Sequence, residues 1–259
     1  MIDIHSHILP GLDDGPKEIQ GSLKIVEAAS SSGTTAMVAT PHALNGIYVN
    51  NRNEIIAAIA MLQDLLMTAG IPVTLYPGAE TALTPEIFDS IDSGELMTIN
   101  DNGKYLLSEL PACFIREQIF EIVFQLKMRG ITPIISHPER DGNILRNPDI
   151  LVELIHRGCL MQSTARSISG GFGREIKDFS HLLLQNGLIH VISSDCHSET
   201  RRGPDLKTGL DQAADIIGTD IAEKMVLDFP RSIINGEDIE IPPFKGLTKK
   251  RNSRFWKRR

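Results

Sequence analysis

The chain has 259 residues, of which 41% are hydrophobic and 23% charged, as is typical of a soluble globular protein. It contains no run of 18 apolar residues, so we expect no transmembrane helix, and a strand beginning at residue 2 predicts that no signal peptide is present. The three cysteines are far apart, which argues against a disulfide framework or a Cys-x-x-Cys zinc site and favours the cytoplasm.

The net charge of −7 is distributed unevenly. Residues 244–259 contain eight basic residues and no acidic one, which leaves −15 on residues 1–243. We therefore predict one folded domain over 1–243 and a flexible basic tail over 244–259. The tail suits weak contact with an anionic membrane, with Phe255 and Trp256 as interfacial anchors, although a solvated terminus is the alternative. The acidic body disfavours nucleic acid as a partner.

Short apolar segments alternate with segments of helical periodicity throughout the chain. In chain order the pattern predicts strand 2–5, helix 17–32, strand 35–39, helix 52–69, strand 72–76, helix 85–92, strand 104–109, helix 115–129, strand 131–135, helix 148–157, strand 159–162, helix 173–186, strand 188–193 and helices 206–217 and 220–228.

Seven strands separated by helices imply parallel pairing through right-handed crossovers, and hence an α/β fold. An open doubly wound sheet fits the periodicity almost as well as a barrel. Nearly every strand, however, ends on a histidine or a carboxylate. Since a barrel brings all its strand ends to one mouth, these residues favour a single α/β barrel.

The first strand carries His5 and His7, which lie on the same side of an extended chain because they are two residues apart. Asp13, beside a candidate ligand, is expected to support the ligands or to be solvated, and we assign no role to His156, His181 and His190. A mixture of imidazole and carboxylate groups without thiolate suits Mn, Fe, Zn or Co, and nine such residues suffice for two or three ions. The candidate metal ligands are His5, His7, Asp14, His42, Glu80, Glu109, His137, Asp195 and His197.

Two arginines lie close to these residues in the sequence, Arg140 three residues after His137 and Arg202 five residues after His197. Three divalent ions, four carboxylates and a bridging hydroxide would leave a net charge of about +1 at the mouth. This charge, together with the guanidinium groups, suits a phosphate dianion. Because bound metals lower the pKa of water and stabilise phosphoryl oxygens, the pattern predicts metal-assisted hydrolysis of a phosphomonoester.

The spacing of these residues carries a family resemblance over residues 1 to about 235. The segments 5–15, 106–111 and 167–174 resemble the bacterial manganese-dependent tyrosine-protein phosphatases of capsule and exopolysaccharide clusters. These enzymes are part of the polymerase and histidinol phosphatase (PHP) superfamily, whose motifs resemble His5-Ser-His7, Thr40-Pro-His42, Gly78-Ala-Glu80, Ser136-His137-Pro-Glu-Arg140 and Ser194-Asp195-Cys-His197.

The resemblance implies a distorted seven-stranded (β/α) TIM-like barrel with three Mn²⁺ ions. It also implies that Arg140 and the arginine five residues past the last histidine bind phosphate. That arginine is Arg202 here, although the adjacent Arg201 leaves the choice between the two open. The implied ligand sets are His5, His7, Glu80 and Asp195 for one ion, Glu80, Glu109 and His137 for a second, and Asp14, His42 and His197 for a third.

The activity implied by the resemblance is hydrolysis of phosphotyrosine on a protein by a metal-activated hydroxide. The implied substrate is a membrane-associated tyrosine kinase that regulates capsule or exopolysaccharide synthesis. A small-molecule phosphomonoesterase of the histidinol-phosphatase type shares the metal motifs and is the alternative enzyme. A metal-stabilised binding module without activity is the alternative outside enzymes, but every ligand position of the family is filled.

Cys196 and Arg202 also have the Cys-x5-Arg spacing of the cysteine-dependent tyrosine phosphatases. The residues between them include no glycine that would let backbone amides curl around a phosphate. Moreover, Cys196 alternates with Asp195 and His197, so on an extended chain its side chain would point away from the metals. We therefore expect no thiolate nucleophile.

Overall fold

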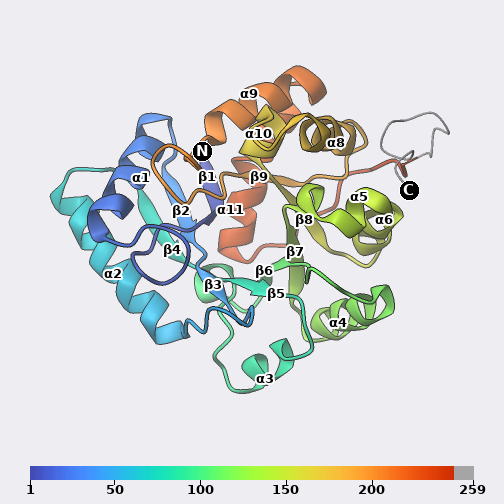
Figure 1. Cartoon of the computed structure of the whole chain (residues 1–259), viewed down its shortest axis with the longest axis horizontal. Helices are drawn as coiled ribbons and strands as arrows, with labels where there is room; N and C mark the ends of the chain where they lie inside the picture. Colours follow the sequence, from blue (N-terminus) through green and yellow to red (C-terminus); the bar gives the residue numbers. More distant parts are fainter. Residues whose placement is uncertain (248–259) are drawn as a thin grey trace.

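The computed structural model describes residues 1–247, in which strands occupy the centre of the molecule and helices surround them (Figure 1). The strands are β1 (Ile2–Ser6), β2 (Ala36–Ala39), β3 (His42–Ala43), β4 (Thr74–Pro77), β5 (Glu80–Ala82), β6 (Tyr105–Glu109), β7 (Thr132–Ser136), β8 (Leu160–Thr164) and β9 (Val191–Ser193). The helices are α1 (Ile19–Ser31), α2 (Arg52–Thr68), α3 (Ile87–Asp92), α4 (Arg116–Met128), α5 (Gly142–Arg146), α6 (Asp149–His156), α7 (Ala165–Ser169), α8 (Arg174–Gln185), α9 (Leu206–Ile217), α10 (Thr219–Lys224) and α11 (Asp228–Asn235), with short 3-10 helices η1 (Ile99–Asp101) and η2 (Pro138–Arg140).

The strands form two parallel sheets, which confirms the predicted α/β class. One sheet has the order β1-β2-β4 and the other has the order β3-β5-β6-β7-β8-β9. The end of β1 is joined to the segment after β9 by a parallel bridge between Ser6 and Cys196. All strands therefore run in the same sense, with their carboxyl ends on the same side of the molecule.

The described residues contain nine strands where the sequence predicted seven. The additional strands, β3 and β5, follow the predicted strands 35–39 and 72–76 and pair with each other in the second sheet. Pro41, between β2 and β3, has no N–H to donate to a ladder. Gly78, between β4 and β5, packs so closely that a Cβ would lie 2.7 Å from Cγ1 of Val38. Because β3 and β5 directly follow predicted strands and have only two and three residues, the sequence pattern did not show them as separate elements.

One predicted helix, 220–228, is wrong as a continuous element, because the chain forms α10 and α11 instead. Leu227 separates them with φ −126° and ψ −68°, outside the helical region. Pro230 then lies in the first turn of α11, where a missing N–H is tolerated. The five-residue helices α5 and α7 were not predicted, since an element of this length shows too little periodicity.

Helix α2 illustrates how the outer helices are specified. The Asn51 side chain accepts a hydrogen bond from the Glu54 backbone and the Glu54 side chain returns one, which forms a capping box at the start of the helix. The buried residues follow helical spacing and face α1 and β4. They are Ile55, Ile59, Leu62 and Leu66.

The described residues include only the beginning of the predicted tail. The Phe244 ring lies 5.0 Å from the His156 ring, and the Lys245 backbone N–H donates to the Asn186 carbonyl at 2.9 Å. Residues 248–259, with seven of the eight basic residues of the predicted tail, lie outside the described part of the chain. In residues 1–247, no helix combines the length and the apolar composition that crossing a bilayer requires.

Candidate metal centre

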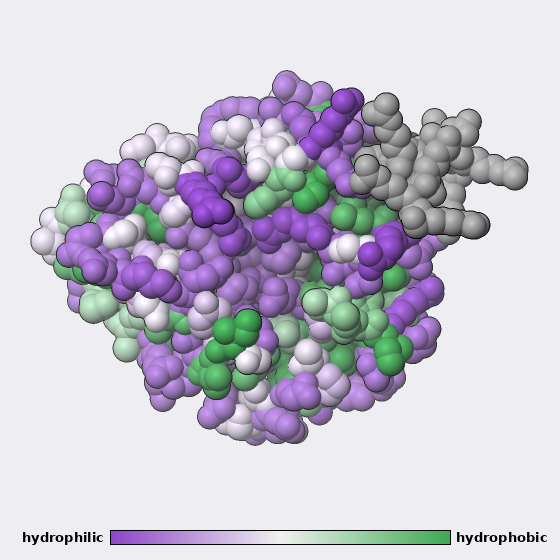
Figure 2. Space-filling view, viewed as in Figure 1, coloured by the Kyte–Doolittle hydropathy of each residue, from purple (hydrophilic) through white to green (hydrophobic). Residues whose placement is uncertain are grey.

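The nine predicted ligand residues gather where β1, β2, β4, β6, β7 and β9 end. His5 lies in β1, and His42 and Glu80 begin β3 and β5, while Glu109 ends β6. The others follow β1, β7 or β9 in connecting segments. Figure 2 shows a hydrophilic hollow near the centre of the face seen in Figure 1.

The deepest group consists of two histidines and two carboxylates. His5 Nε2 lies 3.1 Å from His7 Nε2, 3.3 Å from Glu80 Oε2 and 3.4 Å from Asp195 Oδ1. His7 Nε2 lies 3.4 Å from the same Glu80 oxygen. All four side chains are buried, so their nitrogen and oxygen atoms face one another in a space shielded from solvent.

Glu80 connects this group to the residues at the mouth. Its Oε1 lies 3.0 Å from His137 Nε2 and accepts a hydrogen bond from Ser136 Oγ at 2.5 Å. Its Oε2 lies 3.3 Å from His42 Nδ1, which is 3.9 Å from Glu109 Oε1. The two oxygens of one carboxylate therefore face different imidazoles.

Asp14, His42 and His197 form the outer side of the cluster. Asp14 Oδ1 lies 3.1 Å from His197 Nε2 and 3.6 Å from His42 Nε2. The His197 ring stacks on the His7 ring with centroids 3.9 Å apart. Because the Asp14 side chain is 45% exposed, the cluster is open to solvent on this side.

The donor atoms are grouped closely enough that they could hold metal ions. Four buried atoms of the cluster have no hydrogen-bond partner, although buried polar atoms normally have one: Glu80 Oε2, Asp195 Oδ1, His42 Nδ1 and His197 Nε2. Mixed imidazole and carboxylate donors fit divalent transition metals. Three groups have donor atoms within 4.8 Å of one another, namely His7, Asp14, His42 and His197; His5, His7 and Glu80; and His42, Glu80 and Glu109.

Two residues of the cluster have an unusual backbone conformation. His137 and Asp195 adopt φ angles of 33° and 54°, in the left-handed region that side chains other than glycine rarely occupy. Backbone hydrogen bonds hold both positions, from Arg140 N–H to the His137 carbonyl at 3.0 Å and from Asp195 N–H to the His5 carbonyl at 2.9 Å. The surrounding structure thus maintains strain at two residues that line the cluster.

Two buried residues orient the histidines of β1. Gln162 Oε1 lies 2.9 Å from His5 Nδ1, and Asp13 Oδ2 lies 2.6 Å from His7 Nδ1. Each contact engages the outer ring nitrogen and turns Nε2 towards the cluster. Gln162 was not predicted, and its place at the end of the predicted strand 159–162 was the only signal in the sequence. For Asp13, the structure favours the supporting role over solvation.

Arg140 and Arg202 approach the cluster from two different segments. The Nη2 atom of each lies 2.8 Å from Asp195 Oδ2. Arg201 is exposed, so Arg202 is the arginine that points into the mouth. The Nε atom of Arg202 is buried without a hydrogen-bond partner. Two guanidinium groups therefore meet at one point beside the candidate metal ligands.

The pKa values in the cluster reflect burial and close opposite charges. Burial opposes ionisation of Glu80 and Asp195, but the His5 imidazole and other cations nearby hold the pKa of both carboxyls well below its usual range. Burial and the neighbouring His7 lower the pKa of His42 to about 4, so this ring is neutral and can donate a lone pair to a metal. At the mouth, burial and the Glu80 charge raise the pKa of Glu109 to about 7.

Cys196 does not take part in the cluster. Its side chain is fully buried among hydrophobic residues, and burial raises the pKa of its thiol far above neutral. A thiol in this state is not a nucleophile. The geometry therefore supports the expectation that the Cys-x5-Arg spacing is incidental.

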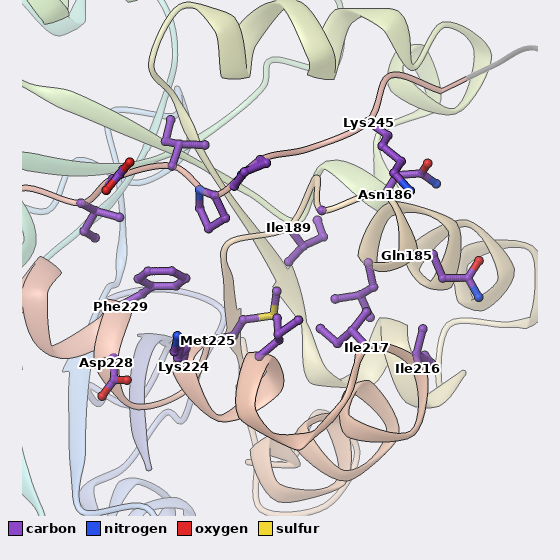
Figure 3. Close-up of a pocket in the computed structure, with 18 of the residues that line it drawn as sticks. Gln185, Asn186, Ile189, Ile216, Ile217, Lys224, Met225, Asp228, Phe229 and Lys245 are labelled. Atoms are coloured by element: carbon purple, nitrogen blue, oxygen red, sulfur yellow. The ribbon is translucent and has the colours of Figure 1, made fainter.

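A cavity of about 900 Å³ lies elsewhere in the molecule. Ile189, Ile217, Met225 and Phe229 are among the residues that line it (Figure 3). None of the nine predicted ligands lines this cavity. A smaller cavity of about 210 Å³ adjoins the cluster and is lined by His137 and Arg140.

Comparison with known proteins agrees with the resemblance seen in the motifs. Residues 1–235 match the family of capsular polysaccharide synthesis proteins CpsB/CapC. The chain is 36% identical over 202 residues to the tyrosine-protein phosphatase YwqE of Bacillus subtilis strain 168, covering 78% of this chain and 79% of that protein. It is 30% identical over 239 residues to the tyrosine-protein phosphatase CpsB of Streptococcus pneumoniae, covering 90% of this chain and 98% of that protein.

Solved structures extend this similarity to the fold. One solved structure comes from a crystallographic study of YwqE from Bacillus subtilis and CpsB from Streptococcus pneumoniae, which are described there as unique metal-dependent tyrosine phosphatases. It has a TM-score of 0.91 at 30% identity, covering 96% of this chain and 100% of that one. A histidinol phosphate phosphatase of Lactococcus lactis shares only the fold, with a TM-score of 0.53 at 14% identity over 84% of this chain and 93% of that one. Since the family match extends over most of its length, the chain belongs to the CpsB/CapC family of capsular polysaccharide synthesis.

Proposed function

We propose that the chain is a metal-dependent tyrosine-protein phosphatase, a phosphoric monoester hydrolase that acts on phosphotyrosine in proteins. The observation that carries the proposal is the convergence of two arginines on a buried cluster of imidazole and carboxylate donors. Relatives at 30–38% identity over most of the chain are named tyrosine-protein phosphatases, one of them as putative. The site and the relatives therefore point to the same reaction.

The proposed metals are three divalent ions, with Mn²⁺ as the first choice and Fe, Co or Zn suited to the same donors. The short distances from Glu80 to His5, His42 and His137 support its place in more than one ligand set. His42 also borders the second set, since its Nδ1 faces Glu80 and Glu109. The proposed sets are His5, His7, Glu80 and Asp195; Glu80, Glu109 and His137; and Asp14, His42 and His197.

The chain's own residues would bind and orient the phosphate. When bound, divalent ions supply a nucleophile from water of lowered pKa and stabilise charge on the phosphoryl oxygens. Arg140 and Arg202 present N–H groups at the mouth and would hold non-bridging oxygens. The unpartnered Arg202 Nε is one donor free to do so. Gln162 and Asp13 would keep the histidine rings in the orientation that binds metal.

The finer features of the fold are part of the same proposal. The two sheets would act as one distorted barrel, because β1 meets the segment after β9 through the Ser6–Cys196 bridge. On the other side, the chain leads from β2 into β3 and from β4 into β5. Residues 1–243 would form the catalytic domain and 244–259 a basic tail, whose first residues Phe244 and Lys245 contact that domain.

The proposed substrate is a membrane-associated tyrosine kinase that regulates capsule or exopolysaccharide synthesis, in keeping with the family to which the chain belongs. We place the enzyme in the cytoplasm, where free thiols such as Cys113, Cys159 and Cys196 persist. The basic tail would provide weak contact with an anionic membrane near that substrate.

A substrate comparison tests the proposed function. Purified protein is loaded with Mn²⁺ and assayed for phosphate release from a phosphotyrosine peptide and from histidinol phosphate, with and without chelator. We expect turnover of the peptide that chelation abolishes and Mn²⁺ restores, with metal content followed by mass spectrometry. Preference for histidinol phosphate would instead identify a small-molecule phosphatase, and absence of phosphate release at full metal occupancy would indicate a binding module.

A further inference from the structure

The segment 44–50, between β3 and α2, presents two apolar side chains to solvent beside the metal centre. Ile47 is 78% exposed and Val49 is 79% exposed, more than any other large hydrophobic residue in the described part of the chain. Figure 2 shows hydrophobic surface next to the hydrophilic hollow. Exposed aliphatic groups gain nothing for the fold, whereas their burial by a partner is favourable.

Hydrogen bonds join this segment to the candidate ligand His42 and also order it internally. The Asn50 side-chain amide donates to the His42 carbonyl at 2.7 Å and to the Leu12 carbonyl at 2.8 Å. The Asn45 side chain accepts hydrogen bonds from the backbone of Ile47 and Tyr48 at 3.1 and 2.9 Å. Any ligand of the segment would therefore be bound at a defined position relative to His42.

The side chains of the segment divide between two directions. The Tyr48 ring stacks on the candidate ligand His42, with centroids 5.8 Å apart and planes inclined by 8°. Its neighbours Ile47 and Val49 are the two exposed residues. An antiparallel bridge between Ala43 and Val49 holds this arrangement. The apolar pair thus forms an edge of the mouth, which we call the 47/49 edge.

We propose that the 47/49 edge binds apolar residues that flank the phosphotyrosine of a polypeptide substrate. The proposal rests on the proposed phosphatase function and names the surface that would select polypeptides. A small phosphomonoester ends at the metal centre, whereas a polypeptide continues beyond it and can cover the edge. Because Tyr48 links the edge to His42, the surface is continuous with the site that receives the phosphate.

The test compares Ile47→Ser/Val49→Ser with the matched control Met67→Ser/Met128→Ser, which removes exposed apolar side chains from α2 and α4. The Mn²⁺-loaded enzymes are assayed with 4-nitrophenyl phosphate and with phosphotyrosine peptides flanked by Val and Leu or by Ser and Glu. Binding is measured separately by calorimetry with an apolar-flanked peptide that carries a non-hydrolysable phosphonate.

For Ile47→Ser/Val49→Ser we expect KM and Kd for the apolar-flanked peptide to rise about tenfold, which corresponds to about 1.4 kcal/mol. We expect unchanged kcat, unchanged kinetics with 4-nitrophenyl phosphate and no effect in the control variant. Equal peptide KM and Kd in variant and wild type would overturn this inference alone, as would an equal loss with 4-nitrophenyl phosphate. A wild-type enzyme that hydrolyses 4-nitrophenyl phosphate but no phosphotyrosine peptide would overturn the proposed function and this inference with it.

Discussion

The Glu80 carboxylate lies close to histidines that belong to more than one of the proposed ligand sets. Its side chain lies within 3.4 Å of His5, His7, His42 and His137, and it is fully buried. Glu109, by contrast, lies at the rim with its pKa raised to about 7 by burial and by the Glu80 charge. We therefore expect more of the bound metal to depend on Glu80 than on Glu109.

We predict that Glu80→Ala loses bound metal and lowers turnover by more than about 100-fold, the most that loss of an outer partner of a ligand usually costs. Glu109→Ala should lose less metal, since it contacts one side of the cluster. Metal content by mass spectrometry and turnover of a phosphotyrosine peptide measure both effects. Full metal occupancy with a near-normal rate in Glu80→Ala would rule out a shared carboxylate.

The arginines should behave differently from the ligands. Arg140→Ala and Arg202→Ala should keep their metal but lose transition-state stabilisation of about 2–4 kcal/mol, as for other preorganised charge donors. Arg201→Ala is the matched control, because this neighbouring side chain is exposed. Steady-state kinetics on metal-loaded enzymes test the prediction, and a silent Arg202→Ala beside a damaged Arg201→Ala would contradict the placement of Arg202.

Cys196 offers a test of the nucleophile. Because its thiol is buried and its pKa is raised, we predict that Cys196→Ser keeps most of the turnover and all of the metal dependence. The exposed Cys113→Ser serves as the control for loss of a thiol. An inactive Cys196→Ser with normal metal content and a normal melting temperature would show that the sulfur takes part in the reaction.

At the scale of elements, neighbouring parallel strands bring together residues that are far apart in the sequence. His190 precedes β9 and is buried against β8, where its Nδ1 accepts a hydrogen bond from the Met161 backbone at 2.9 Å. Burial lowers the pKa of His190 to about 4, so this imidazole stays neutral in the folded protein at pH values where the unfolded chain is protonated. The stability of the folded protein therefore depends on pH through His190 at the β8–β9 contact.

The sign of this effect follows from proton binding. Between pH 6.5 and pH 4 the unfolded chain binds a proton at His190 that the folded protein does not bind, so stability falls as the pH decreases. His190→Asn keeps an acceptor for Met161 and should remove a pH-dependent loss of up to about 3 kcal/mol at pH 4. Urea unfolding with chelator present, from pH 7.5 to pH 4, compares it with the exposed His156→Asn. Parallel pH profiles for wild type and His190→Asn would refute the prediction.

At the scale of the whole molecule, the acidic body and the basic tail differ in their expected roles. Phe244 and Lys245 already contact the folded body, so a truncation that tests the tail should begin after Leu247. This boundary retains the described contacts and removes seven basic residues together with Phe255 and Trp256. The truncation therefore removes most of the charge of the tail and leaves the contacts of Phe244 and Lys245 in place.

We predict that deletion of residues 248–259 leaves turnover of 4-nitrophenyl phosphate unchanged and weakens sedimentation with anionic liposomes at low salt. Each Lys or Arg near an anionic leaflet contributes about 1 kcal/mol, and salt screens the attraction. Neutral liposomes provide the control. Equal sedimentation of full-length and truncated protein with anionic liposomes would favour a solvated terminus without membrane contact.

The sequence by itself determined the α/β class, most of the strands and helices, and the histidines and carboxylates at the strand ends. Alternation of apolar segments predicted the seven strands other than β3 and β5, because buried parallel strands and amphipathic helices have distinct periods. His5, Glu80, His137 and Asp195 could be selected since ligand-type residues after apolar strands are rarely needed for packing. The spacing within each motif is local information, which a sequence contains.

Only the tertiary structure decided how these local units meet. The division into two sheets, the contact of Gln162 with His5 and the choice of Arg202 over Arg201 depend on pairing between segments far apart in the chain. The same holds for the exposure of Ile47 and Val49, which look like core residues in the sequence. These features arise from strand register and side-chain direction in three dimensions, and neither is encoded in the period of a single segment.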